Sequence, residues 1–440
     1  MYLRSLVVTF ISSLWFGATL RADDKQSSLP PVPAAAALTL AEAQRLACEH
    51  NTDSRIAQIQ VEAAMAQFSM AREFPNPTLG LSIAKINTDR RSNATALGNG
   101  FFDRSYDSIV SLSQLLEVGK RGPRQDSARA GQRAAEAQRD DVRRLLIKSV
   151  SQAYVAVLEA TEEALILGNS AASLRREADL ATLRLRVGDI AETDKAQIEI
   201  TAAQRALDAA AARHIASSAM LVLETLLGTP APAGRIQLSD SLLTLATAHT
   251  VTADEVAPDQ RPDLTAAEAT LAKAESDLVL QHHGVIPDFT VSVLFEHNPP
   301  DAPNTVGLGV SLPLPLWNRN GGAIRAARAA RAQAQALLEK TSAQISADVA
   351  DARSAYREAH ARSDSYRGDL TAKSANVVHT VAYSYEHGGS SLVELLAAER
   401  NDNDIRLASA RAQADAVSAA FALSAALNRN GTTSQSVTTP

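Results

Sequence analysis

The chain is short of three kinds of residue, and each scarcity narrows the possibilities. It has a single cysteine, Cys48, so no disulfide can form within the chain. Aromatic residues make up 4% of its 440 residues, and an aromatic-rich core is therefore not expected. Proline is absent between Pro123 and Pro230 and again between Pro315 and Pro440. Because proline costs roughly 3 kcal/mol inside a helix, these two stretches predict long helices.

No charge of one sign dominates the sequence, and no enzyme motif is present. The formal net charge is -6, and basic and acidic residues are interleaved along the helical stretches, as on a solvated helix face. Nucleic acid is therefore not an expected partner. The sequence contains no Walker loop, zinc-protease motif or dinucleotide fingerprint, and its histidines lack metal-site spacing. We expect no enzyme activity, no cofactor and no bound metal.

Residues 1–22 have the pattern of a secretory signal peptide. Arg4 supplies a short basic start, and the apolar stretch from Ser5 to Leu20 is short for a membrane-spanning helix. No cysteine follows the expected cleavage near Ala22, so a lipid anchor is not expected there. No later stretch is expected to form a membrane helix. Residues 23–37 are expected to form an N-terminal tether, and residues 431–440 a disordered tail.

The sequence repeats itself about 200 residues further on, which indicates duplication of a whole module. Leu-Ser-Gln-Leu-Leu at 112–116 returns as Leu-Pro-Leu-Pro-Leu at 312–316. Arg-Val-Gly-Asp at 186–189, with Glu199 after it, returns as Glu-His-Gly-Gly at 386–389, with Glu399 after it. The predicted domains are a first repeat at 38–228, a connector at 229–262 and a second repeat at 263–430.

Each repeat contains two segments in which apolar residues alternate with small or polar ones. Phe289, Val291 and Val293 alternate with Thr290 and Ser292, for example. Such alternation over about ten residues is typical of a transmembrane strand, although a half-buried strand of a soluble sheet gives the same pattern. Two-stranded hairpins are barely stable alone, and four strands cannot close a barrel, so several copies would have to combine. The predicted strands are 78–86, 108–118, 288–296 and 305–315.

Helices flank the strands in both repeats. Thr39 is a good N-cap for a first helix that is expected to run to about Arg72. After each strand pair the sequence predicts a helical hairpin, at 125–228 and at 323–430. Glycines at 188 and at 388–389 mark the hairpin turns, because the left-handed backbone of a helix end favours glycine. A helix of about 60 residues spans about 90 Å, far more than a compact domain needs.

The order of these segments resembles the TolC-type outer-membrane factors, over roughly residues 38–430. The resemblance rests on Phe-Pro-Asn-Pro-Thr-Leu at 74–79, Glu-Val-Gly-Lys-Arg at 117–121, the Asn-Arg-Asn-Gly-Gly segment at 318–322 and the two glycine turns. The second and third of these segments are most similar to the CzcC/CusC heavy-metal efflux branch.

The resemblance implies a mainly α fold with a membrane β-barrel part. Three copies would form a 12-stranded barrel through the bacterial outer membrane, in contact with its lipid, continuous with a 12-helix periplasmic α-barrel. The connector would be the equatorial region. The implied partners are a periplasmic adaptor (a membrane fusion protein) and an inner-membrane RND transporter.

Three functional hypotheses follow from these features. The first is a passive export duct for heavy-metal cations. The second is a duct of the same family for drugs, solvents or other small molecules. The third, from another class, is a soluble periplasmic coiled-coil adaptor or scaffold. The two matched modules and the helical C-terminal region argue against the third.

The resemblance also implies roles for residues at the hairpin turns. Glu394 and Asp194 would line the pore constriction, where a ring of carboxylates favours cations. The alternative is that both are acids of a helix N-terminus, stabilised by the helix dipole. A hydrogen bond from Tyr385 to Asp194 would form a closed-state latch. The expected docking surface for the adaptor comprises Val187, Gly188, Gly388 and Gly389.

Overall fold

The computed structural model describes residues 37–83, 108–248, 261–298 and 302–429, all within one unit of the chain. The predicted signal peptide, nearly all of the tether, and the tail at 431–440 lie outside the described residues. The helices are α2 (Leu40–His50), α3 (Thr52–Arg72), α4 (Arg121–Arg186), α5 (Glu192–Leu226), α6 (Leu242–Ala248), α7 (Pro262–His283), α8 (Gly321–Ser365), η1 (Tyr366–Leu370), α9 (Thr371–Glu386) and α10 (Leu392–Ala426). The strands are β1 (Thr78–Ile83), β2 (Ser108–Leu116), β3 (Phe289–Asn298) and β4 (Ala302–Ser311).

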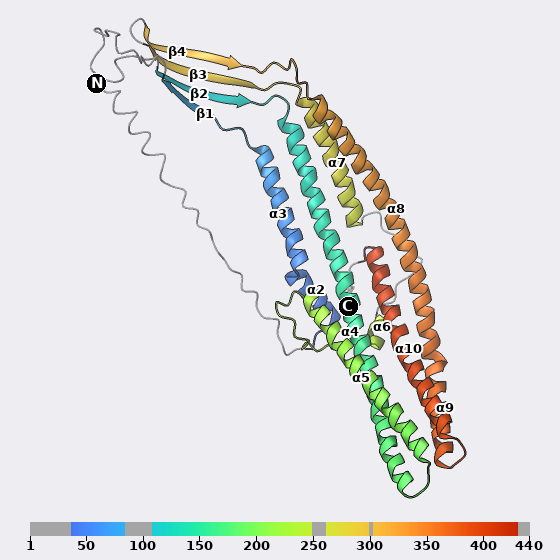
Figure 1. Cartoon of the computed structure of the whole chain (residues 1–440). Coiled ribbons are helices and arrows are strands. Elements are labelled where there is room, and N and C mark those ends of the chain that lie inside the picture. The colour runs from blue at the N-terminus through green and yellow to red at the C-terminus, as the bar shows by residue number, and fades with distance from the viewer. Residues whose placement is uncertain (1–36, 84–107, 249–260, 299–301, 430–440) are drawn as a thin grey trace, which may run out of the picture. The chain divides into compact units, whose positions relative to one another are not determined.

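The four strands form one antiparallel sheet in the order β1-β2-β3-β4, so a strand of one repeat pairs with a strand of the other (Figure 1). The register aligns the apolar positions across all four strands. Leu79, Leu112, Val293 and Leu308 form one such row. The next apolar row is Leu81, Val110, Phe295 and Val306. Since side chains alternate between the faces of a strand, one face of the sheet is apolar and the other carries mainly small and polar residues.

The observed strand ends differ from the predicted ones. β4 starts at Ala302 and ends at Ser311, whereas the prediction was 305–315. Pro313 and Pro315 have no N–H to donate, so the ladder cannot continue through them. β2 stops at Leu116 instead of 118, and β3 covers 289–298 instead of 288–296. Residues 84–86 of the first predicted strand lie outside the described residues.

The first helix of the chain is broken where one continuous helix was predicted. Asn51 is both the C-cap of α2 and the N-cap of α3, and its side-chain oxygen accepts from the backbone N–H groups of Asp53 and Ser54. Its amide also donates to the carbonyl of Leu226, at the end of α5, at 2.9 Å. The break therefore joins the start of the first repeat to its end.

The long helices also differ in detail from their predictions. α4 begins at Arg121, before Pro123 and not after it as predicted. Proline is tolerated in the first turn of a helix, because its missing N–H would have no partner there. α8 begins at Gly321, and the turn η1 interrupts what was predicted as one helix with α9. At the end of η1, the hydroxyl of Thr371, the first residue of α9, donates to the Tyr366 carbonyl at 3.2 Å. The predicted connector contains the short helix α6.

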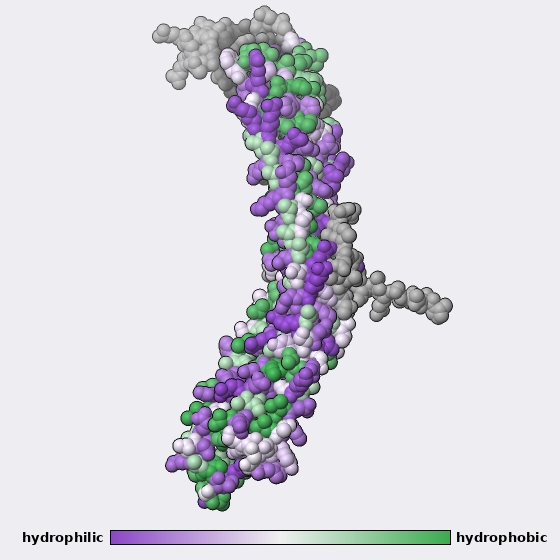
Figure 2. All heavy atoms as spheres, turned by 90° about the vertical axis from the view of Figure 1, so that its right-hand side faces the viewer, coloured by the Kyte–Doolittle hydropathy of each residue, from purple (hydrophilic) through white to green (hydrophobic). Residues whose placement is uncertain are grey.

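α4 is the helix that organises the others. Near its start it packs against α3 and α7, where the Ser127 hydroxyl donates to Asp277 at 2.5 Å. Further along it packs against α5 and α10, where Asn403 donates to Ser170 at 2.9 Å. α8 packs against α7 and α10. Figure 2 shows hydrophobic side chains gathered over the strands at the top and polar ones prominent along the helices below.

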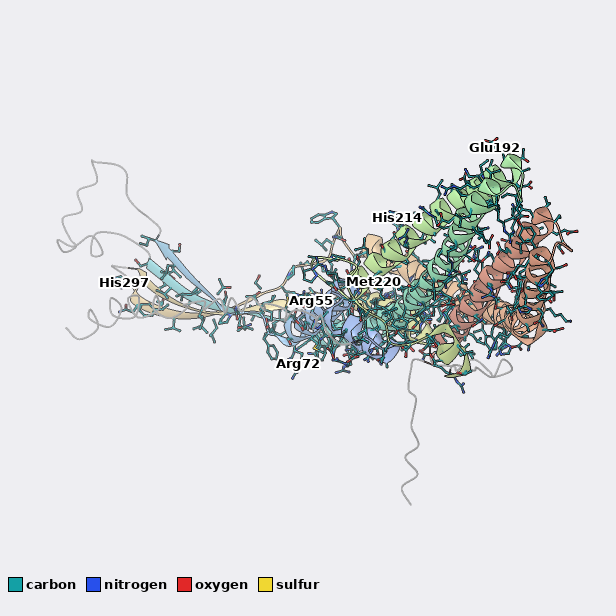
Figure 3. All side chains as sticks on the ribbon, turned by 90° about the horizontal axis from the view of Figure 1, so that it is seen from below. Arg55, Arg72, Glu192, His214, Met220 and His297 are labelled. Carbon is teal, nitrogen blue, oxygen red and sulfur yellow. The ribbon has the colours of Figure 1, made fainter. Side chains whose placement is uncertain are left out.

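By length and composition α5 is long and apolar enough to cross a membrane. The expectation that no helix after the signal would meet those criteria is therefore wrong. Helix α5 lies along α4, and Figure 3 shows Glu192, His214 and Met220 at successive positions along it. Much of its apolar surface is exposed in the single chain, including Leu207 at 71%.

Glu224, near the end of α5, accepts hydrogen bonds from the backbone of the connector. Its side chain is 2% exposed, and its carboxylate accepts from the backbone N–H groups of residues 233–236 at 2.5–3.4 Å. Burial alone would raise the pKa of Glu224, but these four donors together lower it below the usual value. The folded state therefore strongly favours the ionised carboxylate.

We expect Glu224→Gln to lower the free energy of unfolding by about 2–3 kcal/mol. The glutamine NH₂ group cannot accept from the backbone N–H groups that now donate to the carboxylate. The lowered pKa means that the wild-type contribution is complete above pH 4.5 and is lost as the pH falls through the folded-state value. Denaturant midpoints measured from pH 7 down to pH 3 should therefore converge for the two proteins. Glu42→Gln, at an exposed first-turn acid of α2, is the matched control.

Candidate functional site at the helical turns

The turns that end α4 and α9 have the same backbone structure. Gly188 has φ +79° and Gly388 has φ +74°, a conformation that residues with a Cβ rarely adopt. The N–H of Asp189 donates to the carbonyl of Arg184 at 3.0 Å, and the N–H of Gly389 donates to Ser384 at 2.7 Å. These bonds, which close the last helical turn, are those of a Schellman motif. The sequence repeat thus corresponds to a structural one.

The structure brings the two turns together through one apolar cluster. Its members come from α4, α5 and α10, and Ile190 and Leu392 pack against them. A small cavity of about 30 Å³ lies beside this cluster, between the two hairpins, with Arg184 and Tyr385 in its lining. The buried members of the cluster are Leu174, Ala178, Ala181, Ile198, Ala202 and Leu396.

Glu394 has a clear structural partner. Its carboxylate accepts from the N–H of Ser391 at 2.8 Å, and the Ser391 hydroxyl accepts from the N–H of Glu394 at 3.3 Å. This is a capping box, which satisfies two backbone donors at the start of α10. The side chain is exposed, as is that of Asp194 in the first turn of α5. Both acids therefore lie at helix N-termini, which is compatible with either interpretation of their role.

Tyr385 lies next to a cation rather than next to Asp194 in the single chain. The Arg184 guanidinium lies 5.6 Å from the centre of the Tyr385 ring, and Arg184 also approaches Asp189 at 3.8 Å. Among the described residues, no hydrogen bond joins Tyr385 to Asp194. The latch between them stays a prediction.

The predicted docking residues form an open surface. Val187 is 81% exposed, and a Cβ added at Gly188 or Gly388 would meet no atom within 4 Å. At Gly389 an added Cβ would come within 2.8 Å of the Ser384 hydroxyl oxygen. The backbone at both turns is therefore open to close approach by another helix, and adaptor docking there stays a prediction.

Sequence reasoning missed a pair of carboxyl groups beside these turns. Glu177 of α4 and Glu399 of α10 face each other across the two repeats, close enough to share a proton. A weak signal for them was present, because Glu177 follows the buried Leu174 by three residues and Glu399 follows the buried Leu396 by three. An acid at a position with core spacing is unusual. Their pairing could not be foreseen from positions 222 residues apart.

No cluster of three or more metal-ligating side chains occurs in the part of the chain that the structure describes. Two acids and a tyrosine near a pair of open turns can set the charge and the packing at the end of a helical assembly.

Comparison with known proteins identifies the class. The family model "Outer membrane efflux protein" matches residues 43–229 and 255–429, which is most of both repeats. The chain therefore belongs to the outer membrane efflux protein family, the TolC-type outer-membrane factors. Members of this family are transport ducts.

The chain is similar to relatives with different named roles. It is 26% identical to the cobalt-zinc-cadmium resistance protein CzcC of Cupriavidus metallidurans, over 77% of this chain and 78% of the relative. It is also 26% identical to the pyoverdine export outer membrane protein OpmQ of Pseudomonas putida, over 86% of this chain and 83% of the relative. The CusC structure superposes with a TM-score of 0.72 at 18% identity, covering 88% of this chain and 91% of CusC. The structure of VceC from Vibrio cholerae superposes with a TM-score of 0.70 at 19% identity, covering 88% of this chain and 95% of VceC.

Proposed function

We propose that three copies of this chain form a passive export duct through the bacterial outer membrane, with a long periplasmic extension. The observation that carries this proposal is the register of the sheet. It places most of the apolar residues of the four strands on one face and leaves one edge of β1 and one edge of β4 without a partner strand among the described residues. Free edges and an uncovered apolar face are unstable in water, and joining copies in lipid removes both.

The helices support the same assembly. α5 carries exposed apolar residues about every seven positions, which is the spacing of one helix face. Exposed apolar side chains recur with similar spacing along η1 and α9. We infer that α5 of one copy packs against α9 of the next, which would close four helices per copy into a ring. The α5 residues are Ile200, Leu207, Ile215 and Val222, and the opposing ones are Leu370, Val377 and Tyr383.

A soluble adaptor or scaffold is the competing function from another class. Membrane fractionation followed by gel electrophoresis without heating separates the two. The duct should appear in the outer-membrane fraction as an oligomer that dissociates on heating. A monomer in the soluble periplasm would rule out the duct.

The turns beside Gly188 and Gly388 are the proposed contact with a periplasmic adaptor, through which the duct would serve an inner-membrane RND pump. The open backbone at both turns supports this assignment. Cysteine cross-linking from Val187, in a Cys48→Ser background, to a co-expressed adaptor tests it directly.

The proposed cargo is a heavy-metal cation, and the likeness to CzcC supports it. Small-molecule export is the second candidate, and the likeness to OpmQ, which is named for pyoverdine export, supports it. Deletion of the gene distinguishes them. Lost tolerance to cobalt, zinc, cadmium, nickel or copper is expected. Unchanged metal tolerance together with lost drug tolerance would instead favour small-molecule export over metal export.

If Glu394 lines the constriction, Glu394→Gln should lower cation selectivity in planar bilayers, because threefold symmetry removes three negative charges at once. A glutamine oxygen can still accept from the N–H of Ser391, so the helix cap is largely retained. Reversal potentials in a salt gradient measure the effect. Glu192→Gln, another first-turn acid at the same end, is the control. Equal selectivity in both variants would leave Glu394 with capping alone.

A further inference from the structure

The seam between α4 and α10 carries two pairs of charged residues with opposite character. Near its middle, Glu163 of α4 is paired with Arg411 of α10, an ordinary ion pair. Closer to the turns, the facing residues are both acids, Glu177 and Glu399, near enough to share a proton, and Leu174 and Leu396 of the same two helices pack in one apolar cluster beside them. One oxygen of Glu177 is buried and has no hydrogen-bond partner. Two ionised carboxylates cannot hydrogen-bond to each other, so a hydrogen bond between these two acids would require a proton.

The surroundings provide only partial compensation for a second negative charge. Arg176 on α4 and Arg205 on α5 oppose the acids, but Arg205 also lies 3.6 Å from Asp208. Asp402 on α10 adds negative charge, although it is itself paired with Arg406 at 2.6 Å. On α9, the buried Ser374 donates to Asp402 at 2.6 Å. The adjoining apolar cluster excludes water from one side.

We propose that Glu177 and Glu399 form a proton-binding site that joins the two helical hairpins beside their turns, so that acidification tightens the contact between α4 and α10. Glu399 carries the proton and donates it to the Glu177 carboxylate. At neutral pH, a movement that separates the hairpins at this point would release or relocate that proton. The consequence for the width of the duct rests on the proposed function, but the proton site itself does not.

Electrostatics supports the direction of this coupling. Burial raises the pKa of Glu399 to about 8, with the charge and hydrogen bond of Glu177 adding to the effect and Arg205 opposing it. Burial also raises the pKa of Glu177, against the hydrogen bond from Glu399 and the charge of Arg176. Separation that also exposes the two carboxyls to water would move both pKa values back toward the ordinary value of 4.5.

The sign of the pH effect follows from these values. A group whose pKa is raised by the contact supports the contact fully below its ordinary pKa, and that support is lost as the pH rises through the raised value. The contact should therefore weaken between pH 4.5 and about 8 and change little above that. For one proton, the equilibrium shifts at most about tenfold per pH unit.

The duplicated sequence provides a matched control. The position 200 residues before Glu399 is Glu199, and the position 200 residues after Glu177 is Val377. Glu199 lies on α5, is 47% exposed and pairs with Lys195 at 3.0 Å. The second repeat therefore has no acid to match Glu177. Glu199→Gln removes the same kind of charge without touching the pair.

The experiment uses the full chain purified in detergent, with infrared titration as the direct probe of the proton. The wild type should show the carbonyl band of a protonated carboxylic acid at pH 7, and that band should disappear around pH 8–9. Glu399→Gln should lack the band, and Glu199→Gln should keep it. A wild-type spectrum without a protonated carboxyl at pH 7 would overturn the proposal.

Limited trypsin cleavage at Arg184 and Arg186, in the last turn of α4, reports the tightness of the contact. The rate of the wild type is divided by the rate of Glu399→Gln at each pH, which cancels the pH dependence of the protease. This ratio should rise from pH 6 to pH 8, by at most about tenfold per pH unit. It should then level off. Glu177→Gln should lose the dependence too, which covers the case in which Glu399→Gln fails to fold. A ratio of cleavage rates that does not change with pH would contradict the coupling between the proton and the α4–α10 contact. Failure of the oligomer to reach the outer membrane would contradict only the proposed export duct.

Discussion

Replacing Arg261 with methionine is expected to lower the free energy of unfolding by about 3–5 kcal/mol, because it leaves buried charges without their partner. The Arg261 side chain is 3% exposed and lies just before α7. It donates to Asp263 at 2.6 and 3.0 Å, to Asp348 of α8 at 3.3 Å, and to the carbonyl of Ala426 at the end of α10.

Arg261 belongs to a network that joins the two repeats. Arg144 of α4, 6% exposed, donates to Asp141 at 2.6 Å and to the Ala425 carbonyl at 3.0 Å. Burial alone would raise the pKa of Asp263, but Arg261 and then Arg144 lower it below its usual value. Arg144 and Arg261 donate to two of the last carbonyls of α10. Their positive charges are also stabilised there by the negative end of the helix dipole.

The measurement is the urea midpoint of the purified protein, followed by circular dichroism, together with the yield of heat-dissociable oligomer. Arg45→Met is the control, since Arg45 is 58% exposed and pairs with Glu49 only one helical turn away. That change should cost at most about 0.5 kcal/mol. If Arg261→Met and Arg45→Met lowered the midpoint equally, the network would not hold the repeats together.

Leu308→Arg should prevent stable insertion of the sheet into the membrane. Leu308 is 84% exposed in the single chain and sits in the apolar row with Leu79, Leu112 and Val293. An arginine on the lipid face of a barrel strand costs about 2–4 kcal/mol near the bilayer midplane, and a trimer carries the change three times. The amount of oligomer in the outer-membrane fraction should fall sharply.

Thr305→Arg is the matched control, because Thr305 lies on the same strand, on the opposite face, opposite Glu296 in the register. A charge on the face that would line the channel should be tolerated. Insertion of the Thr305 variant and failure of the Leu308 variant would identify the lipid-facing side. Equal behaviour of the two would argue for a sheet wetted on both faces, as the soluble scaffold requires.

Local features were predictable where one residue type decides the backbone. The missing prolines located the long helices, and Gly188 and Gly388 located their turns, because few other residues adopt a positive φ. The alternation around Val291 and Val293 identified strands. The break at Asn51 was not predictable, because the amide needs the Leu226 carbonyl, 175 residues away, to define its position.

By itself the sequence determined the duplicated module, the helical hairpins and the apolar face of each strand, since propensity, turn chemistry and periodicity act over a few residues. Only the tertiary structure decided which strand pairs with which and that Arg144 and Arg261 meet at the end of α10. It alone brought Glu177 to Glu399. Those contacts join positions that lie far apart in the chain, and their energies depend on burial, which no short segment of sequence specifies.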